Sequence, residues 1–259
     1  MTELVLANQA GTFGTPPNCP NLKNGLSRMK QTTAIDLFCG CGGLTLGLKL
    51  AGFRVIGAVD LDPLSVETYK ANHAEVRVWE SDIREVGADD VRRELQLRKG
   101  ELDLLAGCPP CQGFSSVRTL NGSRIVNDPR NNLIFEFLKF VEGLKPKTIM
   151  LENVPGLATD RRMAAFRQEL QRQGYRSDFR ILDAANYGVP QRRRRVILLA
   201  GRRRLIEFAP QLPARRVVRD AIGYLPQAGG SGEARFAGFR AGHGGSLAAV
   251  QQHAGVNKE

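Results

Sequence analysis

Residues 33–60 read TAIDLFCGCGGLTLGLKLAGFRVIGAVD, and this stretch decides the fold. A short apolar run over 33–38 stops at the glycine cluster GCGG, and a leucine-rich segment over 44–52 follows it. A second apolar run over 54–60 ends in an aspartate. Short apolar runs bounded by glycine favour buried strands. The stretch therefore predicts a strand, a glycine-rich turn, a helix and a second strand.

The same alternation continues along the chain to about residue 200. The sequence predicts further strands at 76–79, 102–107, 148–152 and 195–200, and helices at 63–73, 133–144 and 162–174. Strands that alternate with helices favour an α/β fold of the Rossmann-like type, a mostly parallel twisted sheet with helices on both faces. Ligands bind beyond the carboxyl ends of the strands in such sheets. We expect the site at that edge.

Composition divides the chain into three parts. Residues 1–30 are polar and form an N-terminal extension, residues 31–226 form the main domain, and residues 227–259 form a Gly-rich tail. The 259 residues are 42% hydrophobic and 24% charged, which excludes wholesale disorder, collagen and coiled coil. No segment resembles a membrane span or a signal peptide. Five cysteines do not suggest a disulfide framework, so we expect a cytoplasmic protein with reduced thiols.

The charge is strongly positive and unevenly distributed. The net charge is +11, and residues 190–220 hold ten arginines against Glu207 and Asp220. Arginine forms bidentate contacts with phosphates and bases, so a polyanionic partner fits this segment. A solvated basic face is the alternative interpretation.

The first candidate site binds a nucleotide-like cofactor. The glycine-rich turn allows close approach of a ligand to the backbone. Asp60 ends the second strand, where an acid can accept hydrogen bonds from ribose hydroxyls, and Asp82 follows the third, where a carboxylate can hold an adenine amino group. The turn lacks the spacing typical of dinucleotide sites. S-adenosylmethionine, which carries adenosine without phosphate, suits it better.

The second candidate site is a thiol in a turn stiffened by two prolines, GCPPCQGFS at 107–115. Cys39, Cys41, Cys108 and Cys111 could form a zinc site, and Cys108 with Cys111 could form a redox pair. The third interpretation is a nucleophilic thiolate at Cys111. Beside a methyl donor, a thiolate that adds to carbon 6 of cytosine makes carbon 5 reactive.

That chemistry also needs a group at the ring nitrogen N3, where negative charge develops. Glu152 ends the fifth strand and could fill this role. The segment QRRRR at 191–195 stands just before a strand. Alternate side chains of an extended segment point the same way, so Arg193 and Arg195 are expected on one face.

Together these motifs resemble the cytosine carbon-5 DNA methyltransferase family, from about Thr33 to Pro226. The motifs that carry the resemblance, in family order, are DLFCGCGG at 36–43, PPCQGFS at 109–115, ENV at 152–154 and QRRRR at 191–195. The resemblance implies that Cys111 is the nucleophile, that Glu152 binds a flipped-out cytosine, and that Arg193 and Arg195 orient the base. It implies an S-adenosylmethionine pocket, with S-adenosylhomocysteine as product, lined by Phe38, Cys39, Gly40, Cys41, Gly42, Gly43, Asp60, Leu61, Asp82, Ile83, Pro110 and Leu133. The expected substrate contacts are Gln112, Ser115, Asn153 and Gln191.

The resemblance also implies partners. Duplex DNA is the expected substrate, and no metal is expected. Family members normally carry a target-recognition domain and a closing segment after the lead-in at 217–226, and the 33 residues after Pro226 resemble neither. We therefore expect the alpha-type subunit of a split enzyme, whose second polypeptide carries recognition, with a cognate restriction endonuclease as a further partner. A degenerate relative, a truncated chain and an RNA-acting enzyme are the alternatives.

Overall fold

The computed structural model describes residues 31–110 and 132–224. The expected N-terminal extension, the Gly-rich tail and the residues Cys111, Gln112 and Ser115 lie outside the described residues.

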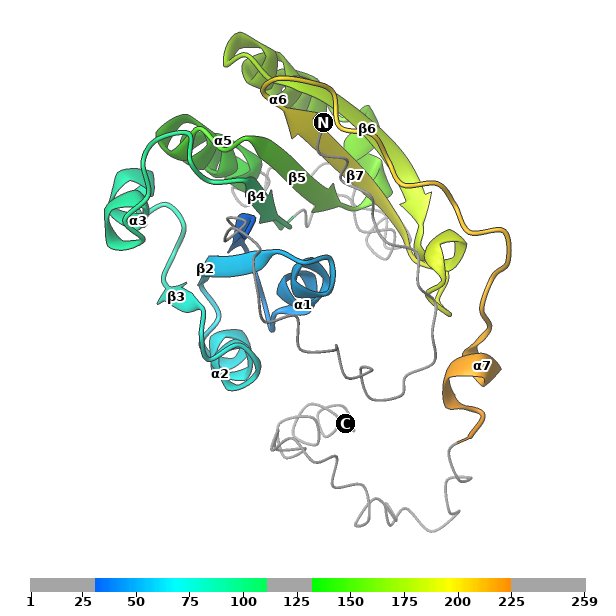
Figure 1. The fold of residues 1–259 in the computed structure, drawn as a ribbon. Coiled ribbons are helices and arrows are strands. Elements are labelled where there is room, and N and C mark those ends of the chain that lie inside the picture. The colour runs from blue at the N-terminus through cyan, green and yellow to red at the C-terminus, as the bar shows by residue number, and fades with distance from the viewer. Residues whose placement is uncertain (1–30, 111–131, 225–259) are drawn as a thin grey trace, which may run out of the picture.

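Seven strands form the sheet of the described residues, in the order β3-β2-β1-β4-β5-β7-β6 (Figure 1). Six strands run in one direction, and β7 is antiparallel to both of its neighbours. The fold is therefore the mostly parallel α/β sheet that the sequence predicted. The strands are β1 (Thr33–Leu37), β2 (Arg54–Asp60), β3 (Arg77–Glu80), β4 (Leu104–Gly107), β5 (Thr148–Asn153), β6 (Arg176–Asp183) and β7 (Arg194–Gly201).

Helices cover both faces of the sheet (Figure 1). They are α1 (Gly43–Leu50), α2 (Pro63–Asn72), α3 (Ala88–Glu94), α5 (Leu133–Leu144), α6 (Arg161–Arg172) and the short α7 (Val218–Ile222), with 3₁₀ turns η3 (Pro155–Thr159) and η4 (Ala184–Tyr187). Helices α3, α5 and α6 pack on one face, and α1 and α2 on the other. No helix of the described residues is long and apolar enough to cross a membrane.

Each face of the sheet has its own core, because alternate residues of a strand point to opposite faces. Ile35 and Leu37 of β1 pack in the core under α5, whereas Ala34 packs in the core under α1 and α2. Helix α5 buries six side chains, Ile134, Phe137, Leu138, Phe140, Val141 and Leu144, at helical spacing. Helix α2 begins at Pro63, and the Asp62 carboxylate caps it by accepting from the Ser65 amide at 2.9 Å.

One strand, β6, and two helices, α3 and α7, are not predicted from the sequence. Strand β6 lies at the edge of the sheet, and its polar residues give no apolar run. Helix α3 buries Val91 alone, and α7 buries no side chain, so neither shows an apolar stripe. The third predicted strand, 76–79, is displaced by one residue to Arg77–Glu80. Weak burial leaves a weak sequence pattern.

Candidate active site at the carboxyl edge of the sheet

The ends of four neighbouring strands meet at one edge of the sheet. Leu37 of β1 pairs with Val59 of β2 and with Gly107 of β4, and Gly107 pairs with Leu151 of β5. The glycine-rich turn, the Cys-Pro-Pro segment and Glu152 therefore follow adjacent strands. This is the edge where parallel sheets bind ligands.

The glycine-rich turn is held in a strained shape by the end of β2. Phe38 and Gly40 have φ angles of 60° and 51°. The Gly40 amide donates to Asp60 Oδ2 at 2.7 Å, and the Cys39 amide donates to the Val59 carbonyl at 3.1 Å. A Cβ added at Gly40 would meet no atom within 4 Å, so the turn borders open space. Asp60 thus shapes the turn, and its place at the strand end agrees with the prediction.

The two cysteines of the turn have different surroundings. Cys39 is buried in the core under α1 and α2, and burial raises the pKa of its thiol above the ordinary value. Its side chain packs in that core, and the cofactor contact expected of Cys39 stays a prediction. Cys41 is exposed. Within 31–110 and 132–224 no cluster of three or more potential metal-ligating side chains occurs, which gives the zinc interpretation no support there.

Tyr69 in α2 and His73 directly after it pack against the glycine-rich turn. Neither residue was predicted as part of the site from the sequence. Lys49 Nζ donates to His73 Nδ1 at 2.7 Å, so His73 Nε2 carries the proton and donates to the Gly42 carbonyl at 3.2 Å. The Tyr69 ring packs edge-on against the His73 ring, with centroids 4.8 Å apart. Burial, together with Lys49, lowers the pKa of His73 below its usual range and keeps the ring neutral.

The substitution Gly42→Ala tests this support. A Cβ at Gly42 would lie 2.5 Å from the His73 ring, and the φ of 93° is left-handed. We expect a loss of stability of about 1–3 kcal/mol, measured by urea unfolding. Gly47→Ala in α1 is the matched control, because a Cβ there meets nothing within 4 Å. Equal stabilities of the two variants would contradict this account.

Asp36 is fully buried in β1 beneath the turn. Thr45 Oγ1 donates to its Oδ2 at 2.8 Å, and the Thr45 hydroxyl also lies 2.8 Å from the Tyr69 hydroxyl. Asp36 Oδ1 has no hydrogen-bond partner among the described residues. Burial, reinforced by the nearby Asp60 carboxylate, raises the pKa of Asp36 from 3.8 to about 7.

This raised pKa predicts how stability depends on pH. The folded state holds the Asp36 proton between pH 3.8 and about 7, where the unfolded state releases it. Stability from this group is therefore full below pH 3.8 and falls as the pH rises to about 7, by at most roughly 1.4 kcal/mol per pH unit. We expect Asp36→Asn to be more stable than the wild type at pH 8 and to lose most of that advantage near pH 4. Urea unfolding at both pH values checks this, and a pH-independent difference would contradict it.

The ends of β2 and β3 offer carboxylates and apolar surface. Arg84 forms two hydrogen bonds with the Asp82 carboxylate, at 2.9 and 2.5 Å, and holds the pKa of Asp82 at about 2. Asp82 is thus ionised and oriented. Leu61 is 62% exposed, and Leu64, which the sequence analysis missed, is 59% exposed. Ile83 is buried in the core, so its side chain does not line this surface.

A carboxylate with two guanidinium groups occupies the end of β5. Arg195 Nε lies 2.9 Å from Glu152 Oε1, and Arg193 Nη2 lies 3.7 Å from the same oxygen. The two arginines share one face of the segment, as predicted from alternation. Glu152 is an antiparallel partner of Ile197, which brings the start of β7 to the carboxyl edge. Gln191 is exposed and lies further out on the same segment.

Asp183 at the end of β6 fixes the arginine segment, and sequence reasoning missed it. Its Oδ1 accepts hydrogen bonds from the Arg193 amide at 3.1 Å and the Ala185 amide at 3.2 Å. The Ala184 amide donates to the Arg193 carbonyl at 3.0 Å. These bonds hold the backbone of Arg193 while its guanidinium faces Glu152.

Asn153 holds the Cys-Pro-Pro segment in place, and the substrate contact expected of it stays a prediction. It is buried, its Nδ2 donates to the Pro109 carbonyl at 2.8 Å, and its Oδ1 accepts from the Val154 amide at 2.8 Å. Both ends of the amide are therefore engaged.

Pro110, the residue before Cys111, is half-buried at the same edge. Phe38 and Leu133 are half-buried against the core under α5.

The surroundings of Cys108 favour the protonated form of its thiol. Burial raises the pKa of its thiol, and the adjacent Glu152 carboxylate raises it further. A protonated thiol is a weak nucleophile and a weak redox partner. This environment counts against the redox-pair interpretation.

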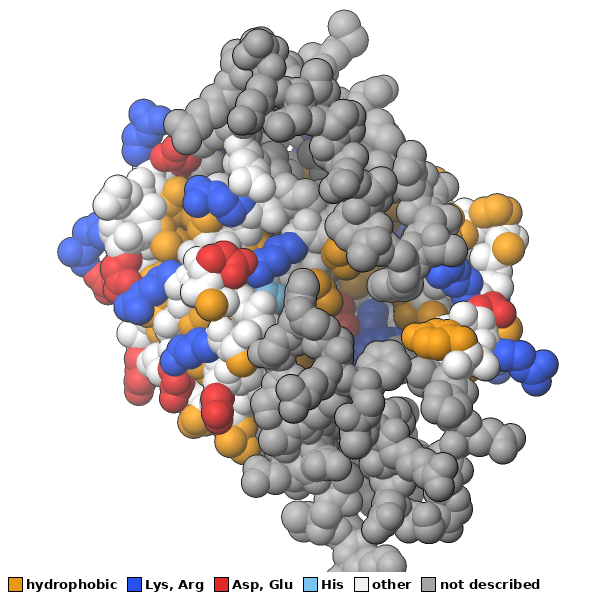
Figure 2. All heavy atoms as spheres, turned by 60° about the horizontal axis from the view of Figure 1, so that its bottom comes forward, with side chains coloured by type: hydrophobic (Ala, Val, Ile, Leu, Met, Phe, Trp, Pro, Cys, Tyr) orange, Lys and Arg blue, Asp and Glu red, His pale blue; other side chains and the backbone are white. Residues whose placement is uncertain are grey.

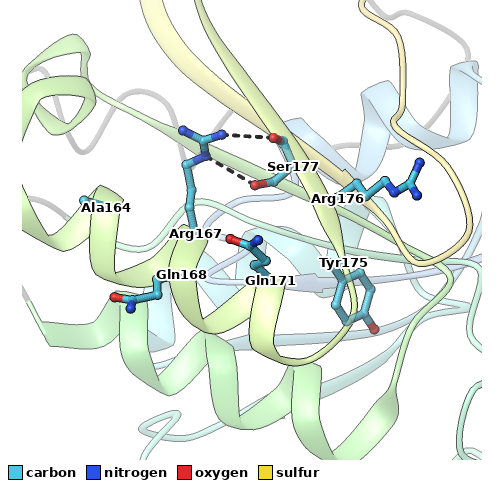
Figure 3. A pocket seen from close by; sticks show the side chains of 7 residues that line it. All are labelled: Ala164, Arg167, Gln168, Gln171, Tyr175, Arg176 and Ser177. Carbon is cyan, nitrogen blue, oxygen red and sulfur yellow. Dashed lines mark hydrogen bonds between the residues drawn. The ribbon is translucent and has the colours of Figure 1, made fainter.

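A hollow of about 490 Å³ lies elsewhere, between α6 and β6 (Figure 3). Its lining residues are Ala164, Arg167, Gln168, Gln171, Tyr175, Arg176 and Ser177. Arg167 Nη2 donates to the Ser177 carbonyl at 3.1 Å across it (Figure 3). No expected site residue lines this hollow, so we place the active site at the carboxyl edge on chemical grounds.

The fold is that of the S-adenosylmethionine-dependent methyltransferases. The order of the strands, the antiparallel β7 and the residues gathered at the carboxyl edge define this class of protein. A model of the C-5 cytosine-specific DNA methylase family matches residues 32–223, and the chain belongs to this family.

Individual relatives agree with this membership. Type II methyltransferase M.XorII of Xanthomonas oryzae is 38% identical over 77% of this chain, and the chain spans 48% of that relative. Type II methyltransferase M.AquIA of Picosynechococcus is 33% identical over 75% of this chain, which spans 89% of it. A crystal structure described as a DNA modification methyltransferase encoded within an E. coli prophage has a TM-score of 0.65 at 29% identity, covering 76% of this chain and 56% of the other. The chain therefore spans about half of some relatives and nearly all of another.

Proposed function

We propose that this chain transfers a methyl group from S-adenosylmethionine to carbon 5 of a cytosine in DNA, with Cys111 as the nucleophile. The observation that carries the proposal is the Glu152 carboxylate flanked by Arg193 and Arg195, on the strand beside the Cys-Pro-Pro segment. Family membership supports the same chemistry. The target base must leave the duplex stack to reach residues in such a site.

The residues at the ends of β1 to β3 fit S-adenosylmethionine. The open glycine turn accommodates a ligand close to the backbone, and Asp60 and Asp82 offer carboxylate acceptors for hydroxyl and amino groups. Leu61 and Leu64 offer apolar surface for an adenine ring. When bound, the cofactor supplies an electrophilic methyl group on a sulfonium centre.

Protein residues then make the cytosine ring reactive. The Cys111 thiolate forms a bond to carbon 6, and the electron pair displaced from the ring double bond makes carbon 5 a nucleophile. A proton shared between Glu152 and N3 balances the negative charge that develops there, and the same carboxyl group accepts a hydrogen bond from the amino group. Arg193 and Arg195 hold Glu152 and stabilise negative charge beside it. After carbon 5 gains the methyl group, its proton passes to water. The electron pair left behind re-forms the ring double bond, and the Cys111 thiolate leaves carbon 6.

We further propose that target recognition is supplied by a second polypeptide. Phosphate contacts position a protein on DNA, whereas contacts to base edges specify the sequence. M.AquIA, which this chain nearly spans, shows that type II methyltransferase chains of similar extent occur. Four apolar side chains in and beside α7, Val217, Val218, Ile222 and Tyr224, are 52–76% exposed, and α7 stands away from the sheet (Figure 1). Such a segment suits a contact with another domain.

The test is transfer of a labelled methyl group from S-adenosylmethionine to unmethylated duplex DNA, with bulk RNA as the parallel substrate. The chain is tested alone and with the product of the adjacent reading frame. We expect incorporation into DNA, with strong stimulation by the second chain. Incorporation into RNA alone would favour the RNA alternative. Tight cofactor binding without transfer under either condition would instead indicate an inactive relative.

The setting follows from this activity. We place the enzyme in the cytoplasm, acting on chromosomal DNA, with a cognate restriction endonuclease that cleaves unmethylated sites. Deletion of the gene should then expose chromosomal sites to that endonuclease, and unchanged cleavage patterns would contradict the pairing.

A further inference from the structure

Arginines lie at both ends of strand β7. The proposed function assigns a role only to those at its start. Arg193 and Arg195 face Glu152 at the start of the strand. Arg202–Arg204 follow its last residue, Gly201, which pairs with Thr148 at the start of β5. The paired stretch of six residues spans roughly 17 Å at about 3.3 Å per residue. The second arginine group therefore lies at the opposite edge of the sheet from the active site.

Backbone hydrogen bonds bring three basic loops together at that opposite edge. The Gly100 amide donates to the Leu144 carbonyl at 2.8 Å, and the Arg202 amide donates to the Lys147 carbonyl at 3.1 Å. Arg202 Nη2 also donates to the Gly100 carbonyl at 3.1 Å. We call this group of residues the far-edge patch: Arg98, Lys99, Lys145, Lys147, Arg202, Arg203 and Arg204.

The positive charge of the far-edge patch is only partly neutralised. Glu101 pairs with Arg98 at 3.5 Å, and Asp103 pairs with Lys147 at 2.6 Å. Within the described part of the chain, the ion pairs include none of Lys99, Lys145, Arg203 and Arg204. The surface around α2 and α3 is different, because basic and acidic side chains alternate there (Figure 2), with pairs such as Arg77–Glu94. A surplus of cations thus marks the far edge.

We propose that the far-edge patch binds the phosphate backbone of a second nucleic-acid segment, separate from the segment whose cytosine enters the active site. Arginine and lysine heads on separate loops suit a row of phosphates, and such binding needs no apolar contact. A protein partner would need buried aromatic or apolar anchors at the centre of its contact. In the described loops that carry the patch, Leu205 is the only exposed large apolar side chain, at 47%, and one such residue does not make an apolar anchor site.

The far-edge patch and Glu152 lie at opposite ends of β5 and β7, so we assign them to two different duplex segments. The chain would therefore hold two duplex segments at once. This inference rests on the proposed binding of DNA at the active site, but it does not require methyl transfer itself. Nucleic-acid bridging can occur in a chain without catalysis, and catalysis can occur without bridging.

The experiment compares wild type with Arg203→Glu/Arg204→Glu. Lys70→Glu/Lys139→Glu is the control, which changes the net charge equally at exposed positions on α2 and α5. A biotinylated duplex on beads captures each full-length protein, and retention of a second, fluorescent duplex is measured. We expect the far-edge variant to lose retention by about tenfold or more and its salt slope, d log K/d log[salt], to shrink by about 2. The control should behave as wild type, and methyl transfer to a short duplex should be the same for all three.

Three results would overturn the proposal. The first is that the wild type retains no second duplex. The second is that both charge-reversed proteins retain the second duplex equally, which would place bridging elsewhere on the chain or in a dimer. Poly-glutamate could bind wild type but not the far-edge variant while duplex retention stays unchanged, which would identify an acidic protein as the partner. Loss of methyl transfer with intact bridging would count against the proposed function alone.

Discussion

We expect that replacing Cys111 by serine abolishes methyl transfer while cofactor binding remains. A serine hydroxyl is far less acidic than a thiol, so it does not supply the anion that adds to carbon 6. The expected fall in kcat is at least about 10³-fold, in the range seen when a nucleophile is removed from other enzymes. Labelled methyl incorporation measures the loss, and calorimetric titration with S-adenosylhomocysteine measures cofactor binding.

Cys108→Ala is the matched control for this prediction. Cys108 lies in the same segment, but burial and Glu152 keep its thiol protonated. We expect it to retain most of the activity. A duplex with 5-fluorocytosine provides a second measurement. Carbon 5 of this base carries fluorine in place of hydrogen, so it has no proton to lose and the covalent adduct persists. Wild type and Cys108→Ala should form a covalent complex on a denaturing gel, and an active Cys111→Ser enzyme would refute the thiolate mechanism.

Replacing Glu152 by glutamine lowers kcat by about 10²–10⁴-fold, the usual contribution of a group that holds or moves a proton at the reacting centre. The glutamine amide keeps the size of the side chain but removes its charge. It also leaves Arg195, now 2.9 Å from the carboxylate, without its ionic partner. The KM for S-adenosylmethionine should change little, because most of the expected cofactor residues lie in or after β1 to β3 and Glu152 is not among them. Single-turnover kinetics with a saturating duplex separates the two effects.

Glu80→Gln is the control for this second prediction. Glu80 also ends a strand of the same sheet, and its carboxylate pairs with Lys70 at the surface. Arg195→Met combined with Glu152→Gln should cost less than the two single losses together, because the residues act as one unit. Additive losses would show that the two residues act independently, and a Glu152→Gln enzyme as active as the control would show that this carboxylate does not act at the base.

Some residues of the candidate site could be predicted from the sequence and others could not, and the difference follows from whether their contacts are local or distant along the chain. Glu152, Arg193 and Arg195 stand in recognisable motifs, and the structure brings them together. Tyr69 and His73 gave no signal, because a tyrosine and a histidine four residues apart also fit an ordinary helix. Their contact with the Gly42 region joins residues about 30 positions apart. Asp183 ends an edge strand without an apolar pattern, so neither the strand nor its role was visible.

The sequence by itself determined the α/β class, the order of most elements and the chemistry of the motifs, because burial periodicity and local turn geometry are written in neighbouring residues. The tertiary structure decided the direction of β7, because strand pairing depends on partners distant in the chain. That direction brings Arg193 and Arg195 to Glu152 and sends Arg202–Arg204 to the opposite edge. The tertiary structure also buries the Cys39 side chain and engages both ends of the Asn153 amide, since packing and nonlocal hydrogen bonds fix where a side chain goes. One arginine-rich segment of sequence thus becomes two separate surfaces.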